Sequence, residues 1–131
     1  MSVVVGYIPD EYGEAALTEA LAEAQRRGTR VVVVNASRGD SLVDKRYVGE
    51  RSRSELEERL ASAPVDVELR QTIAADVADE ILDVAREVEA EALVIGIRHR
   101  SQVGKLLMGS VATRLLMEAT CPVIAVKPQP R

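Results

Sequence analysis

The fold class of this chain is decided by the stretch Arg30-Val31-Val32-Val33-Val34-Asn35-Ala36. Its four valines are consecutive, so a strand formed here is apolar on both faces rather than on alternate residues. Strands of that kind are typical of parallel sheets that helices cover on both sides. The stretch therefore predicts an α/β protein.

Short apolar stretches and amphipathic stretches alternate on both sides of this strand. Besides residues 30–36, strands are expected at 3–8, 65–71, 93–97 and 123–126, and helices at 14–27, 54–61, 76–89 and 110–119. Gly28 stands where a helix C-terminal glycine belongs, and Ser54 is the expected N-cap of the second helix. Five strands alternating with four helices predict a doubly wound, mainly parallel sheet in one domain that spans residues 1–131.

The composition excludes several classes of function. Apolar residues make up 47% and charged residues 29% of the chain, the balance of a soluble globular protein. Three tyrosines are the only aromatic residues and the net charge is −4, which argues against a nucleic-acid partner. The single cysteine cannot form an internal disulfide, and no His/Cys cluster has the spacing of a metal site. Without a signal peptide or an apolar run of ~20 residues, we expect a cytoplasmic protein with no membrane partner.

A ligand of such a fold binds beyond the carboxyl ends of the strands, where the winding of the sheet reverses. Two segments are predicted to meet there. One comprises residues 9–13, after the first strand. The other follows the fourth strand and reads Gly96-Ile97-Arg98-His99-Arg100-Ser101-Gln102-Val103-Gly104-Lys105-Leu106-Leu107-Met108-Gly109-Ser110.

The second segment has the chemistry of a phosphate site. Gly109 permits close approach of the backbone, and the helix that follows favours an anion at its N-terminus. Positive charge comes from three side chains, Arg98, Arg100 and Lys105. The alternative is that Gly96 and Gly109 only allow tight turns, with the basic residues forming a solvated rim.

Three familiar motifs are excluded. Gly104-Lys105 resembles the end of a P-loop, but Leu106 follows instead of Ser or Thr, and the upstream glycine is too far away. The first strand is not followed by the G-x-G-x-x-G of dinucleotide-binding proteins. Ser110 does not lie in the G-x-S-x-G of hydrolases, and no acid or nucleophile is placed beside His99. We therefore expect that the protein is not an enzyme.

The order and spacing of these segments carry a resemblance to a known family. Gly96 is followed, after His99 and nine further residues, by Gly109-Ser110, and Cys121-Pro122-Val123 opens the last strand. Over essentially the whole chain the sequence resembles the universal stress protein family, which has G-x2-G-x9-G-[S/T] after its fourth strand. The resemblance implies a Rossmann-like, five-stranded sheet of order 3-2-1-4-5. It also implies homodimers and, in one subclass, ATP or AMP bound between strands 1 and 4, with Mg²⁺ accompanying ATP.

The resemblance also implies which residues bind the nucleotide. Ribose and phosphates would be held by the glycine motif and its neighbours, Gly96, Arg98, His99, Gly109, Ser110 and Val111. The adenine would lie near the first loop and the end of the second strand, around Pro9, Asp10 and Ala36. Two positions depart from the family pattern. His99 replaces the second glycine of the motif, and Ile8-Pro9-Asp10 replaces an Asp followed by Gly-Ser.

Three functions compete on this evidence. The first is a stress-response regulatory module that binds ATP or AMP and signals through a homodimer. The second is a family member that does not bind nucleotide and acts as a protein-interaction module, as Ile8 and His99 suggest. The third, a phosphate-ester enzyme on the same scaffold, lacks an acid–base constellation. The homodimer would form through the apolar last strand, whose residues are Val123, Ile124, Ala125 and Val126.

Three further features stay open at this level. His99 either hydrogen-bonds a phosphate and titrates near neutral pH, or is an exposed loop side chain. Cys121 is expected to be a buried, inert thiol rather than a redox sensor. The polar segment 37–52 either folds over the crevice or has no role in it.

Overall fold

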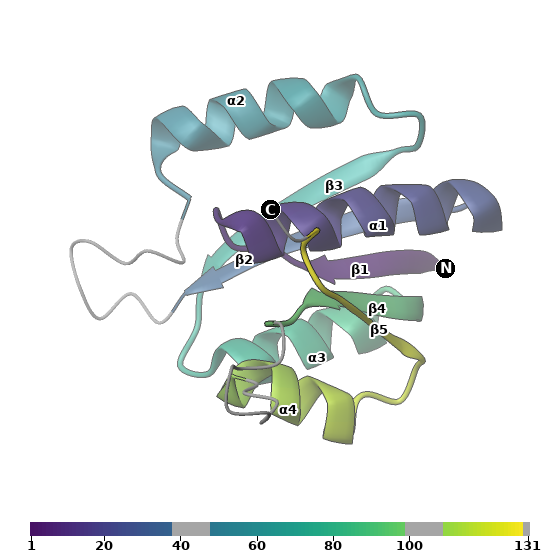
Figure 1. Cartoon of the computed structure of the whole chain (residues 1–131), viewed down its shortest axis with the longest axis vertical. Helices are drawn as coiled ribbons and strands as arrows, with labels where there is room; N and C mark the ends of the chain where they lie inside the picture. The colour runs from purple at the N-terminus through teal and green to yellow at the C-terminus, as the bar shows by residue number, and fades with distance from the viewer. Residues whose placement is uncertain (38–47, 99–108, 130–131) are drawn as a thin grey trace.

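The computed structural model describes residues 1–37, 48–98 and 109–129. Strands and helices alternate along it as β1 (Ser2–Gly6), α1 (Glu11–Arg27), β2 (Arg30–Ser37), α2 (Glu50–Ala61), β3 (Val67–Ile73), α3 (Val77–Glu87), β4 (Ala90–Gly96), α4 (Ser110–Glu118) and β5 (Val123–Val126). The strands form one sheet of order β3-β2-β1-β4-β5, and all four neighbouring pairs are parallel (Figure 1). The predicted α/β fold and strand order are confirmed.

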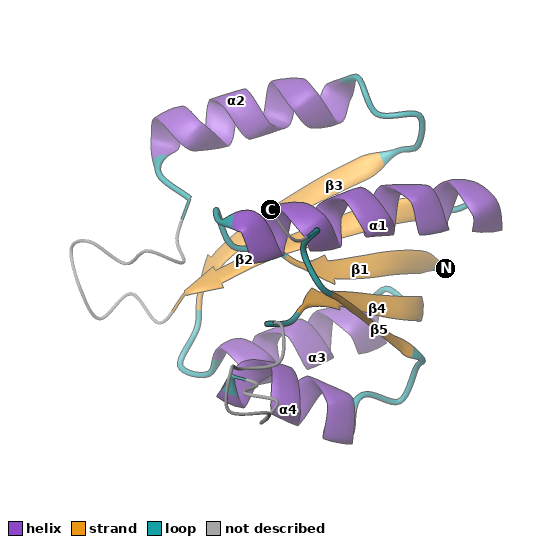
Figure 2. Cartoon of the chain, in the orientation of Figure 1, coloured by secondary structure: helices purple, strands orange, loops and turns teal. Residues whose placement is uncertain are grey.

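Helices cover both faces of the sheet, with α1 and α2 on one side and α3 and α4 on the other (Figure 2). The valine run of β2 divides between the two layers. Val31 and Val33 pack with α1 and α2, and Val32 and Val34 pack with α3 and α4. All four are at most 1% exposed. The consecutive valines are therefore explained by a strand that is buried on both faces.

The helix starts differ from the sequence prediction for local reasons. α1 begins at Glu11 rather than at residue 14, because the Asp10 carboxylate accepts a hydrogen bond from the Gly13 amide at 2.9 Å and caps the helix. The prediction that Ser54 caps the second helix is wrong. α2 begins four residues earlier with Gly49 as its N-cap, and the Ser54 hydroxyl donates to the Glu50 carbonyl from inside the helix.

The turns at the amino end of the sheet depend on two left-handed residues. Gly28 has φ = 66° and ends α1 as predicted. Glu89, between α3 and β4, has φ = 53°. No other non-glycine residue in the described part of the chain has a positive φ. L-residues pay a steric penalty in this region, so Glu89 is a strained position.

Candidate functional site

A hollow of about 170 Å³ opens at the carboxyl ends of β1 and β4. The chain leaves β1 for α1 on one face of the sheet, and α4, which follows β4, lies on the other face, so the segments beyond these strands diverge there. The hollow is lined by the β1–α1 turn, the end of β2, the start of α3, the end of β4 and the first turns of α4. It therefore lies at the switch point that the sequence analysis selected.

Most of the predicted binding residues lie around this hollow. Six of the predicted residues line it: Asp10, Ala36, Gly96, Arg98, Gly109 and Val111. Pro9 and Ser110 are exposed neighbours that do not line it. His99, Arg100 and Lys105 lie outside the described residues, and so does most of the segment 37–52.

Two glycines in the walls are required by packing. A Cβ on Gly96 would lie 2.3 Å from the Tyr12 carbonyl oxygen, and one on Gly13 would lie 1.8 Å from the Ile8 carbonyl oxygen. The start of α1 therefore approaches both β4 and the end of β1 more closely than any side chain would allow. The spacing of the glycine motif predicted a role for Gly96 but not for Gly13, because a close approach of two backbone segments leaves no local sequence pattern.

Gly109 differs from these two glycines. Its φ of −67° and ψ of 159° are open to any residue, and a Cβ there would meet no described atom within 4 Å. Neither its backbone conformation nor its described neighbours require a glycine. Because Gly109 lines the hollow, a ligand that approaches its backbone is a physical reason for the missing side chain.

The N-terminus of α4 is open to an anion. Asp10 caps α1 and Asp76 caps α3, whereas α2 and α4 begin at Gly49 and Gly109 without a side-chain cap. α2 has Glu50 in its first turn, but α4 has no acidic residue there. Among the four described helices, α4 thus combines free first-turn amides with the absence of a competing negative charge. This end of α4 faces the hollow, and Arg98 adds a positive charge beside it.

Another part of the lining of the hollow is apolar. It comprises Ile8, Val34, Ala36, Val77, Ile81 and Ile95. Val77 and Ile81 come from the first turns of α3. They reach the site because the chain enters α3 at the same end of the sheet. An anion-accepting helix end together with an apolar wall suits a ligand with a phosphate and a flat, weakly polar ring.

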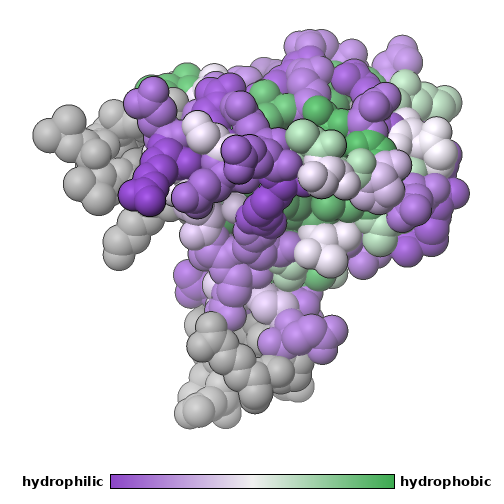
Figure 3. Space-filling view, turned by 90° about the horizontal axis from the view of Figure 1, so that it is seen from above, coloured by the Kyte–Doolittle hydropathy of each residue, from purple (hydrophilic) through white to green (hydrophobic). Residues whose placement is uncertain are grey.

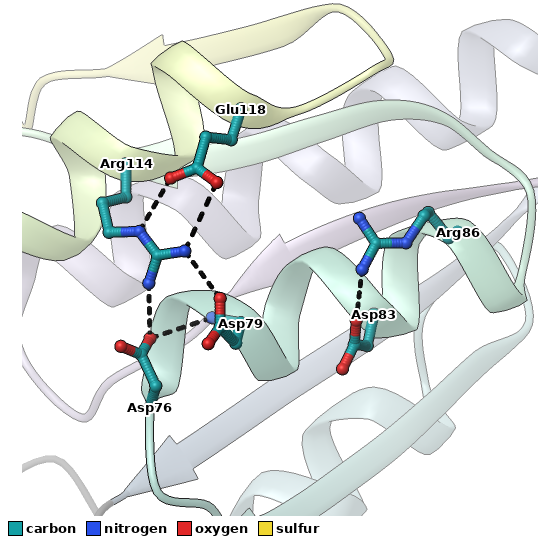
Figure 4. Close-up of polar contacts among 6 residues, drawn as sticks. All are labelled: Asp76, Asp79, Asp83, Arg86, Arg114 and Glu118. Carbon is teal, nitrogen blue, oxygen red and sulfur yellow. Dashed lines mark hydrogen bonds and ion pairs between the residues drawn. The ribbon is translucent and has the colours of Figure 1, made fainter.

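A cluster of charged residues joins α4 to α3 (Figure 4). The Arg114 guanidinium contacts Asp76 at 2.9 Å, Asp79 at 2.6 Å and, on its own helix, Glu118 at 2.8 Å. A hydrogen bond from the Asp79 amide, followed by the charge of Arg114, lowers the pKa of Asp76. The carboxylates of Glu118 and Asp79, Glu118 first, raise the pKa of Arg114 above its usual range. The cluster connects the two helices whose first turns form part of the hollow.

A separate ion pair on α3 and the lone thiol take no part in the hollow. Asp83 pairs with Arg86 one turn further along α3, away from α4 (Figure 4). Cys121 is half-buried against the core between the sheet and the α3–α4 layer. Burial raises the pKa of its thiol, which disfavours the reactive thiolate.

Other kinds of site were sought in the residues that the structure describes. No group of three or more His, Cys, Asp or Glu side chains there is arranged to hold a metal ion. None of the helices in these ranges has the length and apolar character that crossing a bilayer requires. A wider hollow of about 1040 Å³ lies at the opposite end of the sheet, between α2 and the start of β3. Seen from the side of α2, hydrophilic residues dominate the surface and hydrophobic residues show only between them (Figure 3).

The fold and the hollow define a Rossmann-like α/β protein with an anion-accepting helix at its switch point. The model of the universal stress protein family matches residues 1–127. A universal stress protein of Mycolicibacterium smegmatis is 47% identical over 126 residues, which cover 96% of this chain and 97% of that protein. The chain belongs to the universal stress protein family, a family of stress-response proteins.

Solved structures agree with this assignment. A universal stress protein from Archaeoglobus fulgidus superposes with a TM-score of 0.73 at 34% identity, covering 97% of this chain and 98% of that one. A universal stress protein from the same organism in complex with dAMP has a TM-score of 0.68 at 29% identity, with the same coverage. At least one relative of this size and fold therefore binds an adenine nucleotide.

Proposed function

We propose that this protein is a stress-response regulatory module that binds AMP or ATP in the hollow between β1 and β4. The observation that carries the proposal is the start of α4, which has neither a capping side chain nor an acidic residue in its first turn. The dAMP complex of the Archaeoglobus fulgidus relative supports the choice of an adenine nucleotide.

The residues present fit such a ligand. A phosphate group would accept hydrogen bonds from the first-turn amides of α4, next to the Cα of Gly109, with Arg98 as a counter-charge. The base would lie against the apolar wall that includes Val34, Ala36 and Val77. With ATP, Mg²⁺ would accompany the triphosphate.

We propose binding rather than turnover as the activity of the site. Asp10 is the described carboxylate in the wall of the hollow, and one of its oxygens accepts a hydrogen bond from the Gly13 amide. That bond holds the side chain in its helix-capping role. A carboxylate held in this way serves the structure of α1 and is poorly suited to move a proton.

A second candidate function is a protein-interaction module that does not bind nucleotide. The observation in its favour is that Ile8 lines the hollow at the position where the family has an acidic side chain. An apolar residue there removes a hydrogen-bond acceptor for the ribose or base. The two candidates differ in whether the purified protein contains or binds AMP or ATP.

The first experiment identifies a bound ligand directly. The purified protein is denatured, any released small molecule is identified by mass spectrometry, and AMP and ATP are titrated by calorimetry. Because the chain contains three tyrosines and no tryptophan, bound adenine would dominate its absorbance near 260 nm. Absence of co-purified nucleotide, together with no heat of binding at millimolar concentration, would favour the interaction module.

A pair of matched substitutions then tests the position of the ligand. Gly109 and Gly49 are both N-caps with nearly equal backbone angles, and a Cβ on either meets no described atom within 4 Å. Gly109→Val and Gly49→Val should each cost about 1 kcal/mol of stability, since valine is a poor N-cap. Only Gly109→Val should abolish AMP binding, because its side chain would occupy the phosphate position. Equal AMP affinities of the two variants would contradict the proposed site.

We also propose that the protein forms a homodimer through β5, which is an edge strand of the sheet. Its side chains Val123, Ile124 and Val126 are half-buried, and Ala125 is exposed. Met117 and Leu116, on the preceding helix, are 80% and 41% exposed. An apolar edge of this kind is normally covered by pairing with another strand.

A further inference from the structure

Asn35 is a polar residue of β2 that directly follows the run of four valines. Its side chain is completely buried. Val34 and Ala36 line the hollow, so the alternation along β2 turns Asn35 to the opposite face of the sheet. It therefore lies directly behind a wall of the hollow. A buried amide is tolerated only when its hydrogen bonds are made, so its partners indicate why it is there.

Among the residues that the structure describes, Asn35 forms hydrogen bonds with three other parts of the chain. Its Nδ2 donates to the Tyr7 carbonyl at 2.9 Å. Its Oδ1 accepts from the Val48 amide at 3.0 Å and from Nε2 of Gln71 at 3.1 Å. Gln71 also donates to the Val48 carbonyl. One side chain thus joins the end of β1, the residue before the N-cap of α2, and β3.

The hydrogen bond from Asn35 to the Tyr7 carbonyl fixes a part of the wall that the strand-to-strand hydrogen bonds of the sheet do not reach. The register of β1 with β2 ends at the pair Gly6 and Val34, and the Tyr7 amide adds one bond to the Val34 carbonyl. The Tyr7 carbonyl lies beyond that ladder. Tyr7 and Ile8 both line the hollow, so the position of this wall depends on the bond from Asn35.

The same wall residue is tied to both ends of α2. At the start of α2, Arg53 donates to Oε1 of Gln71 at 2.9 Å, which continues the chain of bonds from Asn35. At the end of α2, Arg59 forms two bonds with Glu14 at 2.8 and 2.9 Å, and the Tyr7 hydroxyl donates to that carboxylate at 3.1 Å. α2 is therefore coupled to the hollow through Tyr7.

We propose that Asn35 is a positioning residue of the nucleotide site, which holds the Tyr7 carbonyl and connects the wall of the hollow to the entry of α2. This role rests on the proposed function of the hollow. Asn35 acts on the wall of β1 and β2, where the base would lie, and not on the start of α4, where the phosphate would lie. Because such coupling is reciprocal, nucleotide binding should in turn stabilise the Val48 amide.

The test uses a substitution that removes the hydrogen-bond donor to the Tyr7 carbonyl. Asn35→Asp keeps an oxygen for Val48 and Gln71 but replaces the donor to Tyr7 by a second acceptor. It should weaken AMP binding about tenfold, the scale expected for losing a buried hydrogen bond. The binding of inorganic pyrophosphate, which probes the α4 end alone, should stay within about twofold because none of its groups contacts this wall.

Ser2→Ala is the matched control. Ser2 is also completely buried and polar, and its hydroxyl donates to the Val88 carbonyl at 3.1 Å, but it lies at the amino end of β1 away from the hollow. It should reduce stability without changing AMP affinity. Two outcomes would overturn the positioning role, because each would indicate general destabilisation. In the first, Ser2→Ala and Asn35→Asp lose AMP affinity equally. In the second, Asn35→Asp loses affinity for AMP and for pyrophosphate to the same extent.

Gln71→Leu serves if Asn35→Asp does not fold. Gln71 is only half-buried, and its loss removes one partner of Asn35 and one of Val48. Gln71→Leu should weaken the binding of AMP more than the binding of pyrophosphate. Equal losses of both affinities would overturn the proposal.

Hydrogen exchange adds a readout on the backbone. AMP should slow the exchange of the Val48 amide in the wild-type protein and not in the variants at positions 35 and 71. Failure of the wild-type protein to bind AMP would overturn the proposed function, whereas wild-type AMP affinity in Asn35→Asp would overturn only the role of Asn35.

Discussion

At the scale of single residues, the glycines of this protein have different physical causes. Gly13 and Gly96 leave room for another backbone segment, whereas Gly109 leaves room where no described atom lies. Glycines of the first kind determine whether the fold forms. Gly109 also lines the hollow, which Gly49 does not, so the space beside Gly109 is available to a ligand of the hollow.

Gly13→Ala should destabilise the protein strongly, by about 3 kcal/mol, because the added methyl would overlap the backbone of Ile8. Urea unfolding followed by circular dichroism measures the change. Gly6→Ala is the control, since its methyl would lie 3.3 Å from the flexible end of Ile81 and cost less. Equal stability of the two variants would contradict the close approach of α1 to β1.

Glu89→Gly should stabilise the protein by about 0.5–1 kcal/mol. Glycine adopts the φ of 53° without the steric penalty of a side chain, and this gain exceeds the entropy that glycine adds to the unfolded chain. The melting temperature reports the change. Glu89→Ala removes the same carboxylate but keeps the strain, so a similar gain in that variant would show that charge, not backbone strain, is responsible.

At the scale of elements, α1 and α2 are joined by Tyr7, Glu14 and Arg59. Burial, followed by the Glu14 carboxylate, raises the pKa of Tyr7 from 10.0 to about 12. The hydrogen bond with Arg59 lowers the pKa of Glu14. Tyr7 therefore keeps its proton in the folded state at a pH where the unfolded chain has lost it.

This difference makes stability depend on alkaline pH. The contribution of Tyr7 is fully present below pH 10 and is lost as the pH rises toward 12, with a slope of at most about 1.4 kcal/mol per pH unit. Tyr7→Phe should remove this slope, although it also loses the bond to Glu14. Urea unfolding at several pH values between 10 and 12 tests this. A wild-type slope in Tyr7→Phe would contradict the assignment to Tyr7.

At the scale of the whole molecule, the two edges of the sheet differ in chemistry. The edge strand β3 has charged side chains, with Glu68 paired to Arg30 and Arg70, whereas β5 is entirely apolar. The Pro122 carbonyl accepts a hydrogen bond from the Leu93 amide of β4, and the Val126 carbonyl accepts one from the Ile97 amide just beyond β4. By alternation, the backbone groups of Val123 and Ala125 face the open edge.

Ala125→Lys should convert the proposed dimer into a monomer. In a two-fold pairing of β5 strands, the added lysines would come close together and repel each other. Sedimentation of the wild-type protein and the variant at micromolar concentration measures the effect. Ile73→Lys places the same charge at an exposed apolar position on the opposite edge strand and should leave the dimer intact. A wild-type protein that sediments as a monomer would contradict the dimer itself.

The fold class, the alternation of strands and helices and the location of the hollow could be predicted from the sequence alone. These follow from local patterns, since consecutive valines require two covered faces and Gly28 ends a helix. The starts of α1 and α2 were misplaced, because Asp10 and Gly49 compete with other capping residues nearby and only the packed chain selects between them.

Which side chains share a surface depends on the packing of the folded chain and could not be predicted from local patterns. Gly13, Val77 and Ile81 contribute to the walls of the hollow because segments distant in the sequence meet there. The valine pattern predicts that position 35 is buried, but not that its amide finds Tyr7, Val48 and Gln71. Hydrogen bonds of that kind depend on the register between strands and on the approach of α2. Neither is encoded locally, because both result from packing the whole core.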